Sequence, residues 1–148
     1  MYPFTILTDG VITLRAYEFG DERALHQAIQ ESLPELSPWM SWASKDYTIE
    51  VANSFVTVTR AHWSSGASYN FAIVDARSGE YLGGCGLSQI HPVYHFCNLG
   101  YWVRSTKHGQ GIAGRAAKMI GKYAFEKIKL IRAEIVIAMD NLPSKRVA

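Results

Sequence analysis

The chain has 148 residues, of which 15 are Lys or Arg and 13 are Asp or Glu, so its net charge is +2. This length suits one domain, and the charge is too small to indicate a nucleic-acid partner. No apolar run reaches the roughly 18 residues needed to cross a bilayer, so no membrane association is expected. The N-terminus lacks a secretory signal pattern and both cysteines lie in apolar segments, so we expect a cytoplasmic protein with reduced thiols.

The N-terminal third of the chain has the patterns of a strand, a helix and a loop. Residues 11–15 alternate apolar and polar side chains and predict a strand. Over residues 22–32 apolar side chains recur at helical spacing, and Pro34 is expected to end that helix. Residues 34–47 predict a loop with an unusual number of large apolar side chains, which either folds onto the core or contacts a substrate.

A second helix is predicted over residues 48–63. Several of its residues are β-branched, which weakens the intrinsic helix propensity. Apolar spacing nevertheless favours a helix, and the residues that carry this spacing are Val51, Phe55, Val58 and His62. The helix is expected to end before Gly66.

Three strand patterns follow the second helix. Residues 69–74 and 81–90 are joined by residues 75–79, whose Asp, Ser and Gly are typical of a hairpin. A turn near Pro92 leads to a third strand at residues 98–103. The three strands are therefore predicted to form an antiparallel meander.

The last third of the chain combines a glycine-rich turn, a helix and a strand. Residues 108–114 read His-Gly-Gln-Gly-Ile-Ala-Gly, and helical spacing follows them. Residues 131–139 alternate as a strand, so the intervening helix predicts a crossover to parallel pairing. Residues 1–148 are thus expected to form one domain of the α/β class (α+β type), in which a mixed central sheet has antiparallel N-terminal strands and flanking helices.

The glycine-rich turn has the chemistry of a pyrophosphate cradle. Glycines permit tight turns and leave backbone N–H groups uncovered, while a helix start carries unpaired N–H groups and partial positive charge. From Arg104 to Lys129 there are seven basic residues and one acid. These features together predict an anionic ligand at this turn.

The same turn matches the dinucleotide pattern G-x-G-x-x-G through Gly109, Gly111 and Gly114, with Glu134 about 20 residues further on. A nicotinamide-dinucleotide-binding oxidoreductase is therefore an alternative. It is disfavoured because the preceding strands predict a meander rather than a parallel sheet, and because residues 104–108 separate the strand from the turn. No Lys followed by Ser or Thr comes after the glycines, so a Walker-type cradle is not supported.

Three motifs occur in a characteristic order: Gly100–Val103, His108–Ala113 and Asn141–Ala148. With them the chain resembles the GNAT superfamily of N-acetyltransferases over nearly its whole length, and within it the RimJ/RimL-like ribosomal-protein N-terminal acetyltransferases. His108 departs from the family pattern, which has Arg or Gln at that place. The resemblance implies the GNAT fold, acetyl-CoA as co-substrate, and transfer of the acetyl group to a primary amine by direct attack, with a protein N-terminal amine as one acceptor.

The resemblance also implies a cofactor site along the exposed edge of residues 99–103. The backbone of Val103 and Arg104 would contact the pantetheine arm and the thioester carbonyl. The cofactor-binding residues implied at the turn are His108, Gly109, Gln110, Gly111, Ile112, Ala113 and Gly114. Side chains that would add positive charge are those of Arg104, Lys107 and Arg115.

Asn141 and Ser144 match the family's Asn-x-x-Ser segment. The resemblance implies that Asn141 contacts the cofactor and that Ser144 stabilises or protonates the leaving thiolate. Both residues are also common helix caps, and a capping role is compatible with a role at the cofactor. Glu134 and Glu35 are candidates for the general base, although each is also explained as a solvated or structural carboxylate.

The chain ends at Ala148, where the family continues with a helix and at least one further strand. We therefore expect a truncated C-terminal part, whose uncovered apolar faces favour association, for example as a homodimer. A non-catalytic acyl-CoA-binding module is a further alternative to the enzyme. No metal is expected, because His91 and His95 lack a third ligand at suitable spacing.

Overall fold

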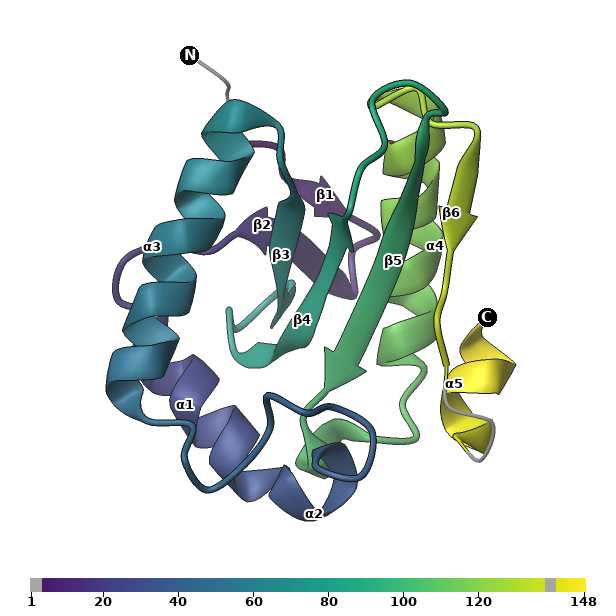
Figure 1. Cartoon of the computed structure of the whole chain (residues 1–148). Helices are drawn as coiled ribbons and strands as arrows, with labels where there is room; N and C mark the ends of the chain where they lie inside the picture. The colour runs from purple at the N-terminus through teal and green to yellow at the C-terminus, as the bar shows by residue number, and fades with distance from the viewer. Residues whose placement is uncertain (1–3, 138–140) are drawn as a thin grey trace.

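The computed structural model describes residues 4–137 and 141–148, which form one six-stranded sheet with helices on both faces (Figure 1). The strands lie in chain order across the sheet: β1 (Leu7–Thr8), β2 (Ile12–Ala16), β3 (Tyr69–Asp75), β4 (Tyr81–Ser88), β5 (Phe96–Val103) and β6 (Arg132–Glu134). Neighbours from β1 to β5 are antiparallel, and β6 runs parallel to β5. The predicted mixed sheet, with its meander and one crossover, is confirmed.

Helices cover the two faces of this sheet unequally. They are α1 (Glu22–Glu31), α2 (Leu33–Leu36), α3 (Ile49–Ser65), α4 (Ile112–Glu126) and α5 (Leu142–Val147), with a 3-10 turn, η1 (Ser105–Lys107), after β5. In Figure 1, α1 and α3 lie on one side of the sheet and α4 on the other. Within the described residues, no helix has the length and apolar character needed to span a membrane.

The core has two parts because both faces of the central strands are covered. Along β3, Phe71 and Ile73 belong to the cluster that packs on α4, and Ala72 and Val74 belong to the cluster that packs on α1 and α3. All four side chains are buried. This follows from the alternation of side chains between the faces of a strand, and it explains why β3 is apolar throughout.

The helix α3 spans residues close to those predicted, but it buries a different face. Thr48 caps its start, since its hydroxyl accepts the N–H of Val51 (3.3 Å). The buried residues are Ala52, Val56, Thr59 and Trp63. The predicted apolar face is shifted from these, and its Val51 and Val58 are 44% and 50% exposed. The predicted helix is confirmed, and the residues whose spacing predicted it lie beside its core face.

Three further boundaries differ from the sequence-based expectations. The helix predicted to end before Pro34 does end there, as α1, but Pro34 then occupies the first turn of a second, short helix, α2, where proline is tolerated. A short strand, β1, precedes the predicted first strand. The predicted strand 131–139 is reduced to three residues, β6, which pair with Phe96–Asn98 of β5. Residues 138 and 139 of this prediction lie outside the described residues.

Candidate active site

The sheet opens between β5 and β6. The strand β6 pairs only with the first three residues of β5, so Leu99–Val103 has no strand partner on that side among the described residues (Figure 1). On the other side, the N–H of Arg104 donates to the carbonyl of Leu82 in β4 (2.8 Å). Because successive peptide groups of a strand point to alternate edges, those of Tyr101 and Val103 face the opening. The exposed strand edge expected from the sequence is present.

The glycine-rich turn follows this edge and leads into α4. Gly109 and Gly111 have φ angles of +78° and +74°, in the left-handed region that favours glycine, and Gly111 is the N-cap of α4. A Cβ atom added at Gly109, Gly111 or Gly114 would meet no atom within 4 Å. The conformation therefore requires glycine at the first two positions, and the space in front of the first N–H groups of α4 is clear.

A cavity of about 720 Å³ connects the turn with the exposed edge and with α5. Of the residues predicted to bind the cofactor or act on it, the cavity brings together Val103, His108, Gly109, Gly111, Ile112, Ala113, Gly114, Asn141 and Ser144. Residues 34–47, the segment rich in large apolar side chains and called the aromatic loop below, contribute Pro38, Trp39 and Met40 to the same lining. Gln110 and Arg104 are not among the lining residues.

The His108 side chain has a partner that the sequence did not reveal. Its Nε2 atom lies 2.7 Å from the carbonyl oxygen of Val103, which accepts the hydrogen bond from the protonated Nε2. This carbonyl belongs to the open edge of β5. His108 therefore ties the glycine-rich turn to the strand edge through its side chain.

Arg104 differs from its prediction. Its Nε donates to Glu31 of α1 (2.6 Å), its guanidinium also donates to the carbonyl of Tyr81 (2.9 Å), and its own N–H is bonded to β4. Neither its side chain nor its N–H is directed at the cavity. The prediction that Arg104 contacts the cofactor is therefore not supported, because each of these groups already serves to join α1, β4 and β5.

The other two basic candidates also have acidic partners. Lys107 lies 3.3 Å from Glu80 and lines the cavity. Arg115 lies 2.9 Å from Asp9, and it is absent from the cavity lining. Lys107 is thus the basic side chain of the three that is placed to attract an anion in the cavity.

Asn141 and Ser144 occupy the start of α5, at the wall of the same cavity. The Asn141 side chain accepts the N–H of Ser144 (3.4 Å) and so caps the helix, as its residue type indicates. The hydroxyl of Tyr101 donates to the carbonyl of Ser144 (2.8 Å). This bond fixes α5 against β5, so the helix cap and the strand edge lie next to each other.

The two carboxylates considered as bases lie in different places. Glu134 lies at the exposed end of β6, 2.7 Å from Arg132, and lines neither cavity. The structure therefore gives Glu134 the position of a surface ion pair. Glu35, in α2, lines the cavity that connects the glycine-rich turn with α5, called the cofactor-side cavity below.

A second cavity, of about 590 Å³, adjoins the first, and Met40, Tyr101 and Trp102 line both. Its wall includes Val51, Phe55 and Val58, the face of α3 that was predicted from apolar spacing. The apolar spacing therefore marked a cavity wall, and the core face lies beside it. Residues of the aromatic loop line both cavities, which gives that loop a place at the site.

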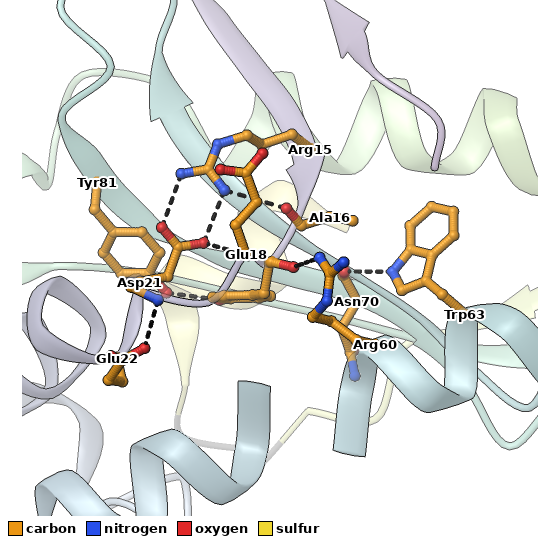
Figure 2. Close-up of polar contacts among 11 residues, drawn as sticks. Arg15, Ala16, Glu18, Asp21, Glu22, Arg60, Trp63, Asn70 and Tyr81 are labelled. Atoms are coloured by element: carbon orange, nitrogen blue, oxygen red, sulfur yellow. Dashed lines mark hydrogen bonds and ion pairs between the residues drawn. The ribbon is translucent and has the colours of Figure 1, made fainter. Parts of the chain in front are cut away.

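Tyr17, which lines the second cavity, is paired with another buried tyrosine, Tyr81. The hydroxyls of Tyr17 and Tyr81 lie 2.6 Å apart, and burial raises the pKa of both, so both remain neutral phenols. Arg60 donates to the carbonyl of Tyr17 (2.7 Å), and Figure 2 shows Arg60 and the Arg15 to Asp21 ion pair in this region. These contacts hold the segment between β2 and α1 in place, and sequence reasoning did not identify them.

A sheet that opens beside a glycine-rich helix start can bind an anionic ligand with an extended arm, and the adjoining second cavity offers space for another molecule. The model of the acetyltransferase (GNAT) domain matches residues 12–148. The chain therefore belongs to the GNAT acetyltransferase family, whose members are enzymes that use acetyl-CoA as co-substrate.

Similar proteins agree with this assignment. "Probable N-acetyltransferase YjcK" of Bacillus subtilis (strain 168) is 29% identical over 68% of this chain and 56% of its own length, so the match spans little more than half of that relative. "Putative ribosomal N-acetyltransferase YdaF" of the same organism is 24% identical over 97% of this chain and 78% of its own length. The structure of Mycobacterium smegmatis RimJ in complex with CoA-disulfide has a TM-score of 0.81, with 26% identity over 98% of this chain and 70% of that one.

Proposed function

We propose that the chain transfers the acetyl group of acetyl-CoA to a primary amine by direct attack of the neutral amine on the thioester. The observation that carries the proposal is the junction of two unlike cavities at the open edge of β5. One cavity contains the glycine-rich cradle, the other has an apolar wall, and Tyr101 and Trp102 line both. An acyl donor and an acceptor bound in these cavities would meet beside Tyr101.

In this proposal the pyrophosphate of the donor binds at the start of α4. The N–H groups of residues 112–114 belong to the first turn of the helix, so they lack intrahelical acceptors and carry partial positive charge. The space left by Gly109 and Gly111 admits the phosphate oxygens. Gln110 contributes through its backbone, and the amides of pantetheine pair with the peptide groups of Tyr101 and the N–H of Val103, since the Val103 carbonyl is already bonded to His108.

Acetyl-CoA supplies an activated acyl group. As the C–N bond forms, the C–S bond breaks, the amine loses a proton and the sulfur gains one. The free N–H groups of the β5 edge are donors for the negative charge that develops on the thioester oxygen. The hydroxyl of Ser144 is the candidate donor to the sulfur, while Asn141 and Tyr101 position it through their bonds to the Ser144 backbone.

A protein N-terminal α-amine is the acceptor that we propose. Its pKa of about 7.7 to 8.0 leaves a sizeable neutral fraction near neutral pH, whereas a lysine side chain, at about 10.4, is almost wholly protonated. The second cavity, called the acceptor cavity below, has no carboxylate among its described lining residues. Such a cavity is suited to an α-amine, which needs no strong base to reach its neutral form. The relative whose match covers 97% of this chain is named "Putative ribosomal N-acetyltransferase YdaF", which supports a ribosomal amine as the acceptor.

The test has two measurements. Calorimetry with acetyl-CoA, CoA and NADH is expected to detect saturable binding of the two CoA species and none of NADH. Thiol release from acetyl-CoA is then followed with a set of short peptides that have free or blocked N-termini, and only the free N-termini are expected to stimulate it. CoA binding without amine-dependent thiol release would indicate a non-catalytic module, and NADH binding alone would contradict the proposal.

A further inference from the structure

The acceptor cavity has a consistent chemical character that the proposed function does not explain. Its walls come from three segments: Leu25 and Ile29 of α1, Trp42 of the aromatic loop, and Val51, Phe55 and Val58 of α3. Each of these side chains is a hydrocarbon or an indole. The volume of about 590 Å³ lies within the range of sites that enclose small molecules or single side chains.

Three glycines lie at the floor of the cavity. Gly84 and Gly86 of β4 and Gly100 of β5 line it. A Cβ atom on Gly84 would come 2.7 Å from the Tyr17 hydroxyl and 2.9 Å from Trp102 Nε1, so a side chain there would clash. A Cβ atom on Gly86 would likewise meet the Asn70 side chain, whereas one on Gly100 would meet nothing within 4 Å, so it is at Gly100 that glycine leaves space for a ligand.

The ionisable groups of this cavity are neutral near pH 7. None of its lining residues within the described ranges is Asp, Glu, His, Lys or Arg. Burial raises the pKa of Tyr47 to about 12, and it raises the pKa of Tyr17, Cys85 and Tyr101 as well. The charged or titratable side chains nearby, among them Glu35, Lys107 and His108, line the cofactor-side cavity instead.

From this arrangement we infer that the acceptor carries an apolar, uncharged group next to its amine, and that this group occupies the cavity between α3 and the glycine floor. The inference rests on the proposed acetyl transfer and specifies its substrate class. Burying a charge without a partner is costly, so polyamines, aminoglycosides and N-termini with acidic or basic first residues are excluded from the cavity. Two kinds of molecule have such an apolar group next to an amine: a peptide with a large apolar first residue, and a small arylalkylamine.

The first experiment measures acceptor binding to the complex with CoA, so that its result does not depend on turnover. The probes are dipeptide amides that begin with Phe, Leu, Glu or Lys, together with phenethylamine and spermidine. The Phe and Leu peptides are expected to bind at least about tenfold more tightly than the Glu and Lys peptides, and phenethylamine more tightly than spermidine. The comparison of the Phe peptide with phenethylamine distinguishes a peptide from a small-molecule acceptor.

The second experiment introduces a charge into the cavity wall. Val58 is half-exposed on α3, so Val58→Glu is tolerated by the fold while placing a carboxylate at the cavity. This variant is expected to weaken binding of the Phe peptide about tenfold and to strengthen binding of the Lys peptide. Thr57→Glu is the matched control, because Thr57 is exposed on the same helix outside the cavity lining, and it is expected to leave both affinities unchanged.

Equal binding of apolar and charged probes, or tighter binding of spermidine, would overturn the inference, as would equal effects of Val58→Glu and Thr57→Glu. These results would leave acetyl transfer intact if amine-dependent thiol release were still observed. Binding of the apolar probes without any thiol release would have the opposite meaning, since the cavity would be assigned correctly while the proposed function would fail.

Discussion

At the scale of single residues, a substitution at Gly114 is expected to affect protein stability and cofactor binding in opposite directions. It lies in the first turn of α4 and lines the cofactor-side cavity, and a Cβ atom there would meet nothing within 4 Å. Gly114→Ala is therefore expected to stabilise the protein by about 0.5–1 kcal/mol, since alanine is the better helix former. The added methyl would stand in the cradle, so the Kd for CoA is expected to rise severalfold. Urea unfolding and calorimetry measure the two effects.

Gly121→Ala is the control for this prediction. Gly121 lies in the same helix, has the same free space around its Cα and is absent from the cavity lining. The substitution is expected to stabilise the protein to a similar extent without changing the Kd for CoA. If both variants left CoA binding unchanged, the start of α4 would not be the phosphate site.

At the scale of elements, the attachment of α5 to β5 is the feature with a functional consequence. The helix has six residues and none of them is buried, so its position depends on specific contacts such as the Tyr101 to Ser144 bond. Tyr101→Phe is expected to speed hydrogen exchange in α5 and to raise the KM for acetyl-CoA about two- to tenfold, the range for one net hydrogen bond. The overall unfolding midpoint should change little, because α5 contributes no buried side chain.

Tyr94→Phe provides the matched control, since Tyr94 is exposed beyond the end of β4 and lines neither cavity. It is expected to change neither the exchange rates of α5 nor the KM. An unchanged KM in Tyr101→Phe, together with faster exchange in α5, would show that α5 does not take part in cofactor binding.

At the scale of the whole molecule, the elements and the glycine-rich turn were predictable because their signals are local. Alternation along β3, the hairpin residues after Asp75 and the glycines before α4 each specify their own backbone. The burial of α3 was not predictable in the same way. Its apolar residues serve both a core face, which includes Val56, and a cavity wall, which includes Val58, and spacing alone does not distinguish the two.

The role of Arg104 was missed for a different reason. A basic residue next to a phosphate-type turn predicts anion binding, but the partner of Arg104 is Glu31, which is 73 residues away in the sequence. The same holds for Tyr17 and Tyr81, which are 64 residues apart. Pairings at such separations depend on how the sheet and α1 are assembled, and a single sequence carries no local signal for them.

The Arg104 to Glu31 ion pair joins α1 to the end of β5, so its titration should affect global stability. The hydrogen bond from Arg104 is the main cause that lowers the pKa of Glu31 below its usual 4.5, with burial opposing it. A lowered folded-state pKa means that the stabilisation is complete above pH 4.5 and is lost as the pH falls through the lower folded-state value. Glu31→Gln keeps the shape of the side chain but removes its charge, so it is expected to cost about 1 kcal/mol at neutral pH.

The difference in unfolding free energy between Glu31→Gln and the unmodified protein is expected to shrink as the pH falls to about 3, because protonation of Glu31 then removes the same charge. Urea unfolding over this pH range measures it. Glu126→Gln, at the exposed end of α4, is the control and should leave the unfolding free energy at neutral pH nearly unchanged. A constant difference at every pH would mean that the contribution of Glu31 comes from packing, because a charge that titrates away cannot stabilise the acidified protein.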